Sequence, residues 1–162
     1  MTMTSNGHHA APVRVEATAS GAPSVLCVDD NVMLGKALGR CIGAEPSLRW
    51  LGAVSDGAQV LETVARLRPS VILMDIDMPG FDTFGTVARL AEVAPDTRVI
   101  MLSGHVDRDY LRRALDSGAW GYLSKAEETP VLIDAIHRAN KGEIVLGKEI
   151  EALQRSADRE NP

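Results

Sequence analysis

The sequence feature that most constrains the fold is the stretch Ser70–Gly80, which reads SVILMDIDMPG. Its residues 70–74 form a short, mostly apolar and β-branched run that stops at Asp75. An apolar run of this length, closed by the turn signal Pro79-Gly80, is typical of a strand buried on both faces of a parallel sheet. An acid at the end of such a strand lies at the carboxyl edge of the sheet, where open α/β folds bind their ligands. We therefore expect Asp75 to belong to a functional site.

Short apolar runs and amphipathic segments alternate along the chain from Ser24 onward. Expected strands cover residues 24–28, 48–54, 70–74, 97–102 and 119–123. Expected helices follow Asn31 and residues 55–57 and cover residues 83–93, 107–117 and 129–140. Five strands alternating with five helices predict a parallel sheet, because each parallel connection needs a crossover and is right-handed. We predict a three-layer, doubly wound α/β fold, and periodicity alone leaves the strand order open.

The chain is long enough for one domain with flanking segments. It has 162 residues, of which 45% are hydrophobic, and this supplies an ordinary core. Residues 1–23 are rich in small and polar residues without periodicity, so we expect a disordered extension. Residues 24–142 are expected to form the domain. Residues 143–162 are expected to be a tail or linker, helical from about 149 to 159, with too little apolar surface to fold alone.

Charge and composition exclude several functional classes. A net charge of −5 argues against a general nucleic-acid surface, so we expect no direct nucleic-acid binding by this segment. No apolar run approaches the ~20 residues of a membrane helix, and no secretory signal is recognisable. Cys27 and Cys41 stand in apolar contexts and are expected to be buried free thiols. These features predict a cytoplasmic protein with no membrane partner.

Charged and hydroxyl residues close four of the five expected strands. They are Asp29 and Asp30 after the first, Asp75 after the third, Ser103 after the fourth and Lys125 after the fifth. A parallel sheet directs all these ends to one edge. The sequence therefore predicts that carboxylates, a hydroxyl and an ammonium meet there.

Three carboxylates in one place need a counter-charge. Two unit charges ~4 Å apart repel by roughly 4 kcal/mol at a partly screened protein edge, and Lys125 offsets only one charge. A divalent cation bound by oxygen ligands offsets the rest, which favours Mg²⁺ or Mn²⁺. Zinc is disfavoured because no His or Cys is expected at the cluster.

A metal, a lysine and a hydroxyl together form a receptor for an incoming phosphoryl group. A carboxylate such as Asp75 can attack phosphorus and form an aspartyl phosphate. The sequence contains neither the GxxxxGK nor the GxGxxG pattern, so ATP and dinucleotides are not expected as direct ligands. We expect the phosphoryl group to arrive on another molecule.

The chain from Ser24 to about Gly142 resembles a response-regulator receiver domain of two-component signalling. The matching motifs, in order at the expected strand ends, are VDD (28–30), MDIDMPG (74–80), MLSG (101–104) and GYLSK (121–125). The resemblance implies the flavodoxin-like strand order 2-1-3-4-5, an order for which receivers are a standard example. The segment GEIVL after residue 141 resembles the linker that leads to a helix-turn-helix output domain in one receiver subfamily.

The resemblance also assigns roles at the site. It implies that Asp75 is the phosphoacceptor and that a histidine kinase or phosphotransfer protein is the donor. Mg²⁺ would be held by Asp29 and Asp30, together with the Asp75 carboxylate and the backbone carbonyl of Asp77. Lys125 would pair with the phosphoryl group.

The same resemblance implies a switch and an output surface. Ser103 would move to hydrogen-bond the phosphoryl group, and Tyr122 would turn inward as it does so. Residues 107–117, the fifth strand and residues 129–140 would then present a changed surface to a downstream protein or a second receiver. The protein would be a signalling switch that catalyses its own phosphorylation and dephosphorylation, and not a metabolic enzyme.

Two other classes remain open at this point. The pair Asp75 and Asp77 also fits the DxD motif of a haloacid-dehalogenase-type phosphatase, although that family carries the motif on its first strand and leaves Asp29-Asp30 unexplained. A receiver-like scaffold that is never phosphorylated is the third possibility, and the intact acidic set argues against it.

Overall fold

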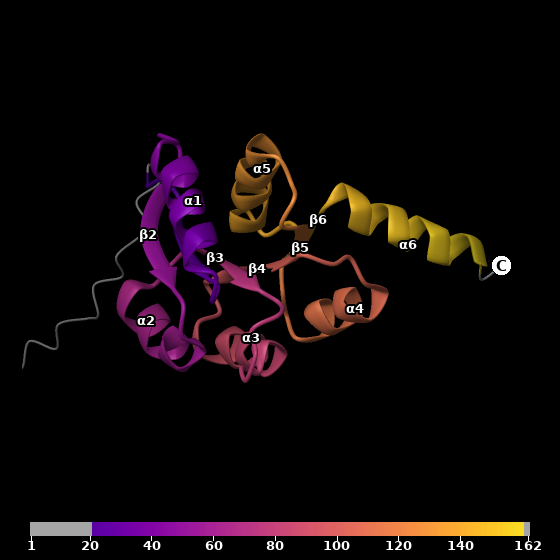
Figure 1. Cartoon of the computed structure of the whole chain (residues 1–162), viewed down its shortest axis with the longest axis horizontal. Coiled ribbons are helices and arrows are strands. Elements are labelled where there is room, and N and C mark those ends of the chain that lie inside the picture. Colours follow the sequence, from indigo (N-terminus) through magenta and orange to yellow (C-terminus); the bar gives the residue numbers. More distant parts are fainter. Residues whose placement is uncertain (1–20, 161–162) are drawn as a thin grey trace, which may run out of the picture.

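A parallel sheet forms the centre of the structure, a computed structural model that describes residues 21–160 (Figure 1). Within these residues the sheet has six strands in the order β2-β1-β3-β4-β5-β6, all paired in parallel. The strands are β1 Ser24–Val28, β2 Arg49–Val54, β3 Val71–Asp75, β4 Arg98–Ser103, β5 Gly121–Ser124 and β6 Val145–Leu146. The doubly wound parallel fold is confirmed, and the expectation of five strands is wrong by one.

The additional strand is β6, which pairs Val145 with Gly121 and Leu146 with Tyr122. Two residues are too few to produce an apolar run or an alternation that a sequence pattern could reveal. The order 2-1-3-4-5 is therefore kept and extended by one short edge strand.

Helices cover both faces of the sheet. They are α1 Val32–Gly43, α2 Val60–Leu67, α3 Thr83–Val93, α4 Arg108–Asp116, α5 Thr129–Asn140 and α6 Lys148–Glu160, with a 3-10 turn η1 at Gly57–Gln59. Figure 1 shows α1 and α5 on one face of the sheet and α2, α3 and α4 on the other. None of the helices in this described part of the chain is long and apolar enough to cross a membrane.

Two apolar layers fill the space between the sheet and its helices. Adjacent strand residues alternate between them, so that Val25 belongs to the layer under α1 and α5 while Leu26 belongs to the layer under α2, α3 and α4. This alternation on a sheet covered on both sides explains why the strands are apolar throughout. Polar residues remain only where strands end, which concentrates them at the two edges.

Side-chain caps fix the turns that leave the carboxyl edge. Asn31 Oδ1 accepts hydrogen bonds from the first amides of α1 at 3.1 and 3.2 Å, and Asp82 and Asp107 cap α3 and α4 in the same way. Such caps satisfy amides that have no partner within the helix. The loops that carry the polar residues are therefore anchored at their helical ends.

The C-terminal part of the described chain continues past α5 through β6 into α6, beside α4 (Figure 1). The expectation of a disordered extension over residues 1–23 falls almost entirely on residues 1–20, which lie outside the described part. The expectation of two buried thiols is half wrong, because Cys27 is buried in β1 and Cys41 is exposed on α1.

Candidate functional site

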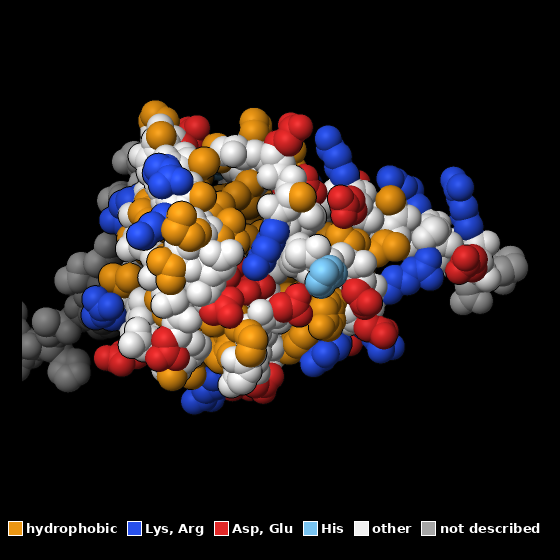
Figure 2. Space-filling view, in the orientation of Figure 1, with side chains coloured by type: hydrophobic (Ala, Val, Ile, Leu, Met, Phe, Trp, Pro, Cys, Tyr) orange, Lys and Arg blue, Asp and Glu red, His pale blue; other side chains and the backbone are white. Residues whose placement is uncertain are grey.

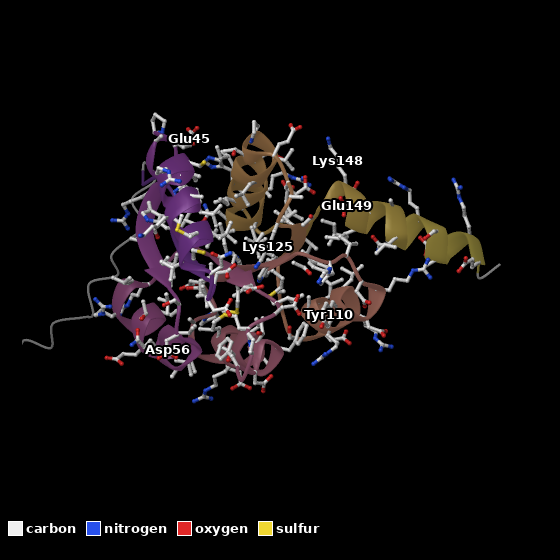
Figure 3. All side chains as sticks on the ribbon, viewed as in Figure 1. Glu45, Asp56, Tyr110, Lys125, Lys148 and Glu149 are labelled. Atoms are coloured by element: carbon white, nitrogen blue, oxygen red, sulfur yellow. The ribbon has the colours of Figure 1, made fainter. Side chains whose placement is uncertain are left out.

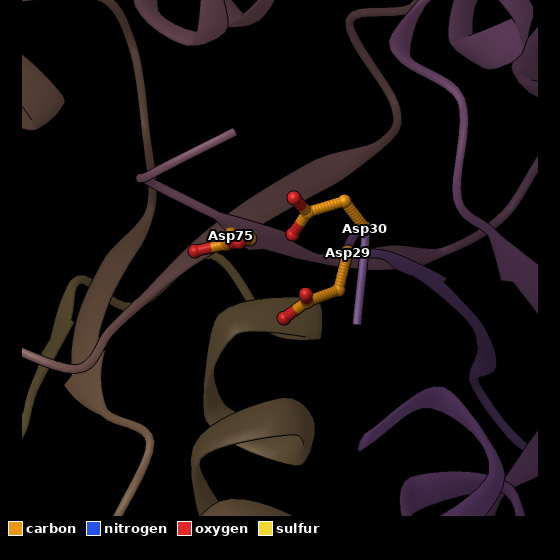
Figure 4. A group of neighbouring side chains, drawn as sticks. All are labelled: Asp29, Asp30 and Asp75. Carbon is orange, nitrogen blue, oxygen red and sulfur yellow. The ribbon is translucent and has the colours of Figure 1, made fainter. Parts of the chain in front are cut away.

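Three carboxylates meet at the carboxyl ends of β1 and β3 (Figure 4). Asp29, Asp30 and Asp75 each offer one oxygen, and these oxygens all lie within 4.8 Å of one another. Asp29 and Asp75 are buried, with 3% and 2% of their surface exposed, while Asp30 is exposed. The carboxylates predicted to gather at this edge are therefore close together, and two of them are withdrawn from water.

Lys125, labelled in Figure 3, follows β5 directly, and its side chain reaches this cluster. Its ammonium lies 2.9 Å from Asp29 Oδ2 and 3.0 Å from Asp75 Oδ1. Burial lowers the pKa of Lys125, but the Asp29 and Asp75 carboxylates outweigh this and hold the pKa above its ordinary value. The lysine is therefore charged, and the cluster keeps an excess of negative charge. Figure 2 shows acidic side chains gathered near the middle of this face.

Backbone amides orient the two buried carboxylates. Asp29 Oδ1 accepts from Asn31 N at 2.8 Å, and Asp75 Oδ1 accepts from Asp77 N at 3.0 Å. Asp29 Oδ2 is buried and, apart from its ion pair with Lys125, has no hydrogen-bond partner within residues 21–160. A buried carboxylate oxygen whose one polar contact is an ion pair, beside two further carboxylates, is the kind of oxygen ligand that a small divalent cation takes. The residues present therefore fit Mg²⁺ or Mn²⁺.

Ser103 and Tyr122 lie on the neighbouring strands and share one acceptor. The Ser103 hydroxyl donates to the His105 carbonyl and accepts from His105 N at 3.0 Å. The Tyr122 ring is fully buried, and its hydroxyl donates to the same carbonyl at 3.0 Å. Burial raises the pKa of Tyr122, so its hydroxyl stays protonated as a donor. The serine, the loop after β4 and the tyrosine are thus one hydrogen-bonded unit.

Asp77 and Tyr110 form the rim of the site. The Asp77 side chain is exposed, and the Asp77 carboxylate is the largest cause of a raised pKa at Tyr110 on α4. The Tyr110 ring packs against Phe84 of α3, with ring centroids 6.1 Å apart. The sequence predicts a helix over residues 107–117 but not the position of Tyr110 beside Asp77, because helical spacing does not reveal which loop a helix faces.

A doubly wound parallel sheet with buried aspartates and a lysine at its carboxyl edge is the arrangement expected of a domain of the receiver class. The comparisons agree with this class. The family model described as the response regulator receiver domain matches residues 25–137. The chain belongs to this family.

Several curated proteins and solved structures are similar to the chain. It is 32% identical over 143 residues to the transcriptional regulatory protein LiaR of Bacillus subtilis, covering 85% of this chain and 68% of that protein. It is 32% identical over 138 residues to the nitrate/nitrite response regulator NarL of Escherichia coli K12, covering 85% and 64%. The signal receiver domain of the putative response regulator NarL from Mycobacterium tuberculosis superposes with a TM-score of 0.70 at 29% identity, covering 75% of this chain and 98% of that domain. The chain therefore spans about two thirds of the length of these two curated relatives.

Proposed function

We propose that this chain is a phosphorylation-operated signalling switch in which Asp75 accepts a phosphoryl group from a histidine kinase or phosphotransfer protein. The observation that carries the proposal is the buried Asp75 carboxylate at the sheet edge, 3.0 Å from Lys125 and within 4.8 Å of two further aspartates. Buried carboxylates and a lysine at the ligand-binding edge of such a fold support a role in chemistry at this site.

The reaction transfers a phosphoryl group from a histidine nitrogen of the donor to a carboxylate oxygen of Asp75. Within residues 21–160 the polar contacts of the Asp75 side chain are made by Oδ1, which leaves Oδ2 as the attacking oxygen. A bond forms between this oxygen and phosphorus while the phosphorus–nitrogen bond of the donor phosphohistidine breaks, and its electron pair returns to the imidazole. Lys125 neutralises charge on the transferred group, and the Ser103 hydroxyl turns from His105 to donate to a phosphoryl oxygen.

Asp29 and Asp30 would hold Mg²⁺ together with the Asp75 carboxylate and the backbone carbonyl of Asp77. An ion bound there would supply positive charge that neutralises the phosphoryl oxygens. Asp29 Oδ1 is already fixed by the Asn31 amide, so Oδ2, whose contact is the Lys125 ammonium, is held in place for a cation.

The signal would leave the domain as a population shift of the β4–β5 side. The Ser103 and Tyr122 hydroxyls both donate to the His105 carbonyl. When Ser103 no longer does so, the hydrogen bond between Tyr122 and this carbonyl changes in strength. We propose that residues 24–142 form the receiver, that α4, β5 and α5 present the output surface, and that residues 143–162 form a tail or linker. The receiver acts in the cytoplasm, without nucleic-acid or membrane contacts of its own.

Incubation with acetyl phosphate and Mg²⁺, followed by intact mass spectrometry, tests the function. We expect one phosphoryl adduct that is absent in Asp75→Asn and in the presence of EDTA. Turnover of many phosphomonoesters would favour the phosphatase alternative. The absence of any adduct would favour a scaffold that is never phosphorylated.

The rim residues supply a finer proposal about signal lifetime. The Asp77 side chain and His105 flank the acceptor and the hydroxyl, so they can orient or block the water that hydrolyses the acyl phosphate. We expect Asp77→Asn and His105→Ala to change the half-life of the adduct. Unchanged hydrolysis rates in both variants would remove this proposal and leave the acceptor role intact.

A further inference from the structure

Helix α6 is attached to the domain at three places, although its sequence has few apolar residues. Figure 1 shows α6 leaving the sheet at β6 and running beside α4. It contacts β5 at its start and α4 further along. A linker that merely connects two domains needs no such attachments, so each one is informative.

The first attachment is an apolar anchor. Ile150 is completely buried and belongs to the same apolar layer as Tyr122 and Leu111. Strand β6 leads into it, because Leu146 pairs with Tyr122 and the amide of Gly147 donates to the Tyr122 carbonyl at 2.9 Å. The first turn of α6 therefore closes the space over the switch tyrosine.

The second attachment joins α6 to α4. The two helices border a groove of about 290 Å³ that is lined in part by Leu111, Leu115, Leu153 and Ala157. Arg108 closes its far end, where its guanidinium donates to Ser156 Oγ at 2.7 Å and lies 3.6 Å from Glu160. An arginine at the start of α4 thus forms a hydrogen bond and an ion pair with residues on the last turns of α6.

The third attachment ties α6 to the turn that carries Lys125. Glu127 Oε1 accepts from the amide of Lys148 at 3.3 Å, at the start of α6. A carboxylate at a helix N-terminus is favourable because it meets unpaired amides and the positive end of the helix dipole. Since Glu127 follows Lys125 by two residues, a change in how Lys125 is held reaches the N-terminus of α6 directly.

We propose that the face of α4 bearing Arg108, Leu111 and Leu115 is an interaction surface for an acidic-ended amphipathic helix, that its occupant is α6 of the same chain, and that this docking is coupled to phosphorylation of Asp75. The inference rests on the proposed function. It adds an internal partner that masks part of the output surface and whose docking responds to the signal.

The direction of coupling follows from Tyr122. Docked α6 fills the space over β5 and so favours the inward position of this ring, in which its hydroxyl binds the His105 carbonyl. When Ser103 leaves this carbonyl for a phosphoryl oxygen, as the proposed reaction requires, Tyr122 keeps the carbonyl without a competing hydroxyl, so phosphorylation also favours the inward ring. Phosphorylation and α6 docking therefore favour each other, and by linkage each must strengthen the other by the same factor.

Hydrogen exchange on the complete chain tests the proposal, with BeF₃⁻ and Mg²⁺ as a mimic of the aspartyl phosphate. We expect amides of residues 148–160 to exchange about fivefold more slowly or better when BeF₃⁻ is bound, together with amides of residues 75–80. In Arg108→Ala and Ile150→Ala, the BeF₃⁻ affinity followed by fluorine NMR should fall by the same factor. Arg155→Ala changes an exposed α6 residue and should leave the affinity unchanged.

The possible outcomes distinguish a failure of this inference from a failure of the proposed function. Protection of residues 75–80 with no change in α6 or in the affinity of the variants would overturn the coupling alone. No protection at residues 75–80 would overturn the phosphoacceptor function and the coupling with it. Protection of α6 that depends on protein concentration and accompanies dimer formation would show that the occupant is the helix of a second copy, against our assignment. Arg108→Ala leaves the core intact, so the test stands even if Ile150→Ala fails to fold.

Discussion

Removing the charge of Lys125 should strongly destabilise the domain in the absence of metal. Its ammonium lies 2.9 and 3.0 Å from two buried carboxylates, and each contact corresponds to about 5–6 kcal/mol of Coulomb attraction at an effective dielectric of about 20. The oxygens of Asp29 and Asp75 lie within 4.8 Å, so their own repulsion is about 3–4 kcal/mol or more on the same scale. Desolvation offsets most of the gross attraction, and breaking a buried pair typically costs about 3–5 kcal/mol. Because a quarter of the Lys125 side chain is exposed, we expect Lys125→Met to cost about 2–4 kcal/mol.

Urea unfolding in EDTA measures this cost, with Lys141→Met as a control at an exposed lysine. In an Asp75→Asn background the cost of Lys125→Met should fall to about half, because one of its two partners is neutral. Millimolar Mg²⁺ should stabilise Lys125→Met more than the parent chain, since the ion supplies the missing positive charge. A loss below about 0.5 kcal/mol in EDTA would refute the charge argument, because that is the scale of an ordinary surface substitution.

Three further predictions concern pH, thiols and the edge strand. The Asp29 and Asp75 carboxylates raise the folded-state pKa of Lys125 above 10.5, so the ammonium contributes its full stability below pH 10.5 and loses it as the pH rises through the folded-state pKa. In urea unfolding, the stability gap between the parent and Lys125→Met should therefore narrow above pH 10.5. A gap that persists there would contradict the argument. A disulfide reagent should label exposed Cys41 rapidly and Cys27 only after unfolding, since burial raises the pKa of Cys27 to about 12; rapid labelling of both would contradict the fold. Gly121→Ala should cost about 1–3 kcal/mol in urea unfolding, because its Cβ would lie 2.7 Å from a Val145 methyl; an unchanged midpoint would mean that β6 does not pack as described.

Sequence patterns predict best the helices and strands that carry a clear signal along their whole length and at their ends. Helices over residues 83–93 and 129–140 agree with α3 and α5, because a cap or a proline marks one end and apolar spacing marks the face. Strand β3 is predictable because it is apolar throughout and stops at an acid. Strand β6 and the burial of Ile150 are not, because a two-residue pairing and a single buried side chain depend on a neighbour that only the folded chain supplies.

Much of the candidate site follows from topology alone. Parallel strands must bring their carboxyl ends to one edge, so Asp29, Asp75 and Lys125 can be grouped without any coordinates. Their mutual distances and the shared contacts of Lys125 with Asp29 and Asp75 cannot be deduced in this way, because they depend on register and side-chain rotamers. The position of Tyr110 beside Asp77 is equally invisible in the sequence, since it depends on how α4 faces the loop after β3.

The charge imbalance at the sheet edge links the local chemistry to a change elsewhere in the domain. Lys125 serves two carboxylates before any reaction, and phosphorylation would replace one of them with a group carrying about two negative charges. We expect the ammonium to give up at least one short contact to meet the new oxygens, and the turn that carries it to adjust. That turn continues to Glu127, which holds the N-terminus of α6. We therefore expect the excess negative charge, which destabilises the resting site, also to drive the change in the output surface. Neutralising Asp30 should reduce this excess, and it should weaken both metal binding and the response of α6.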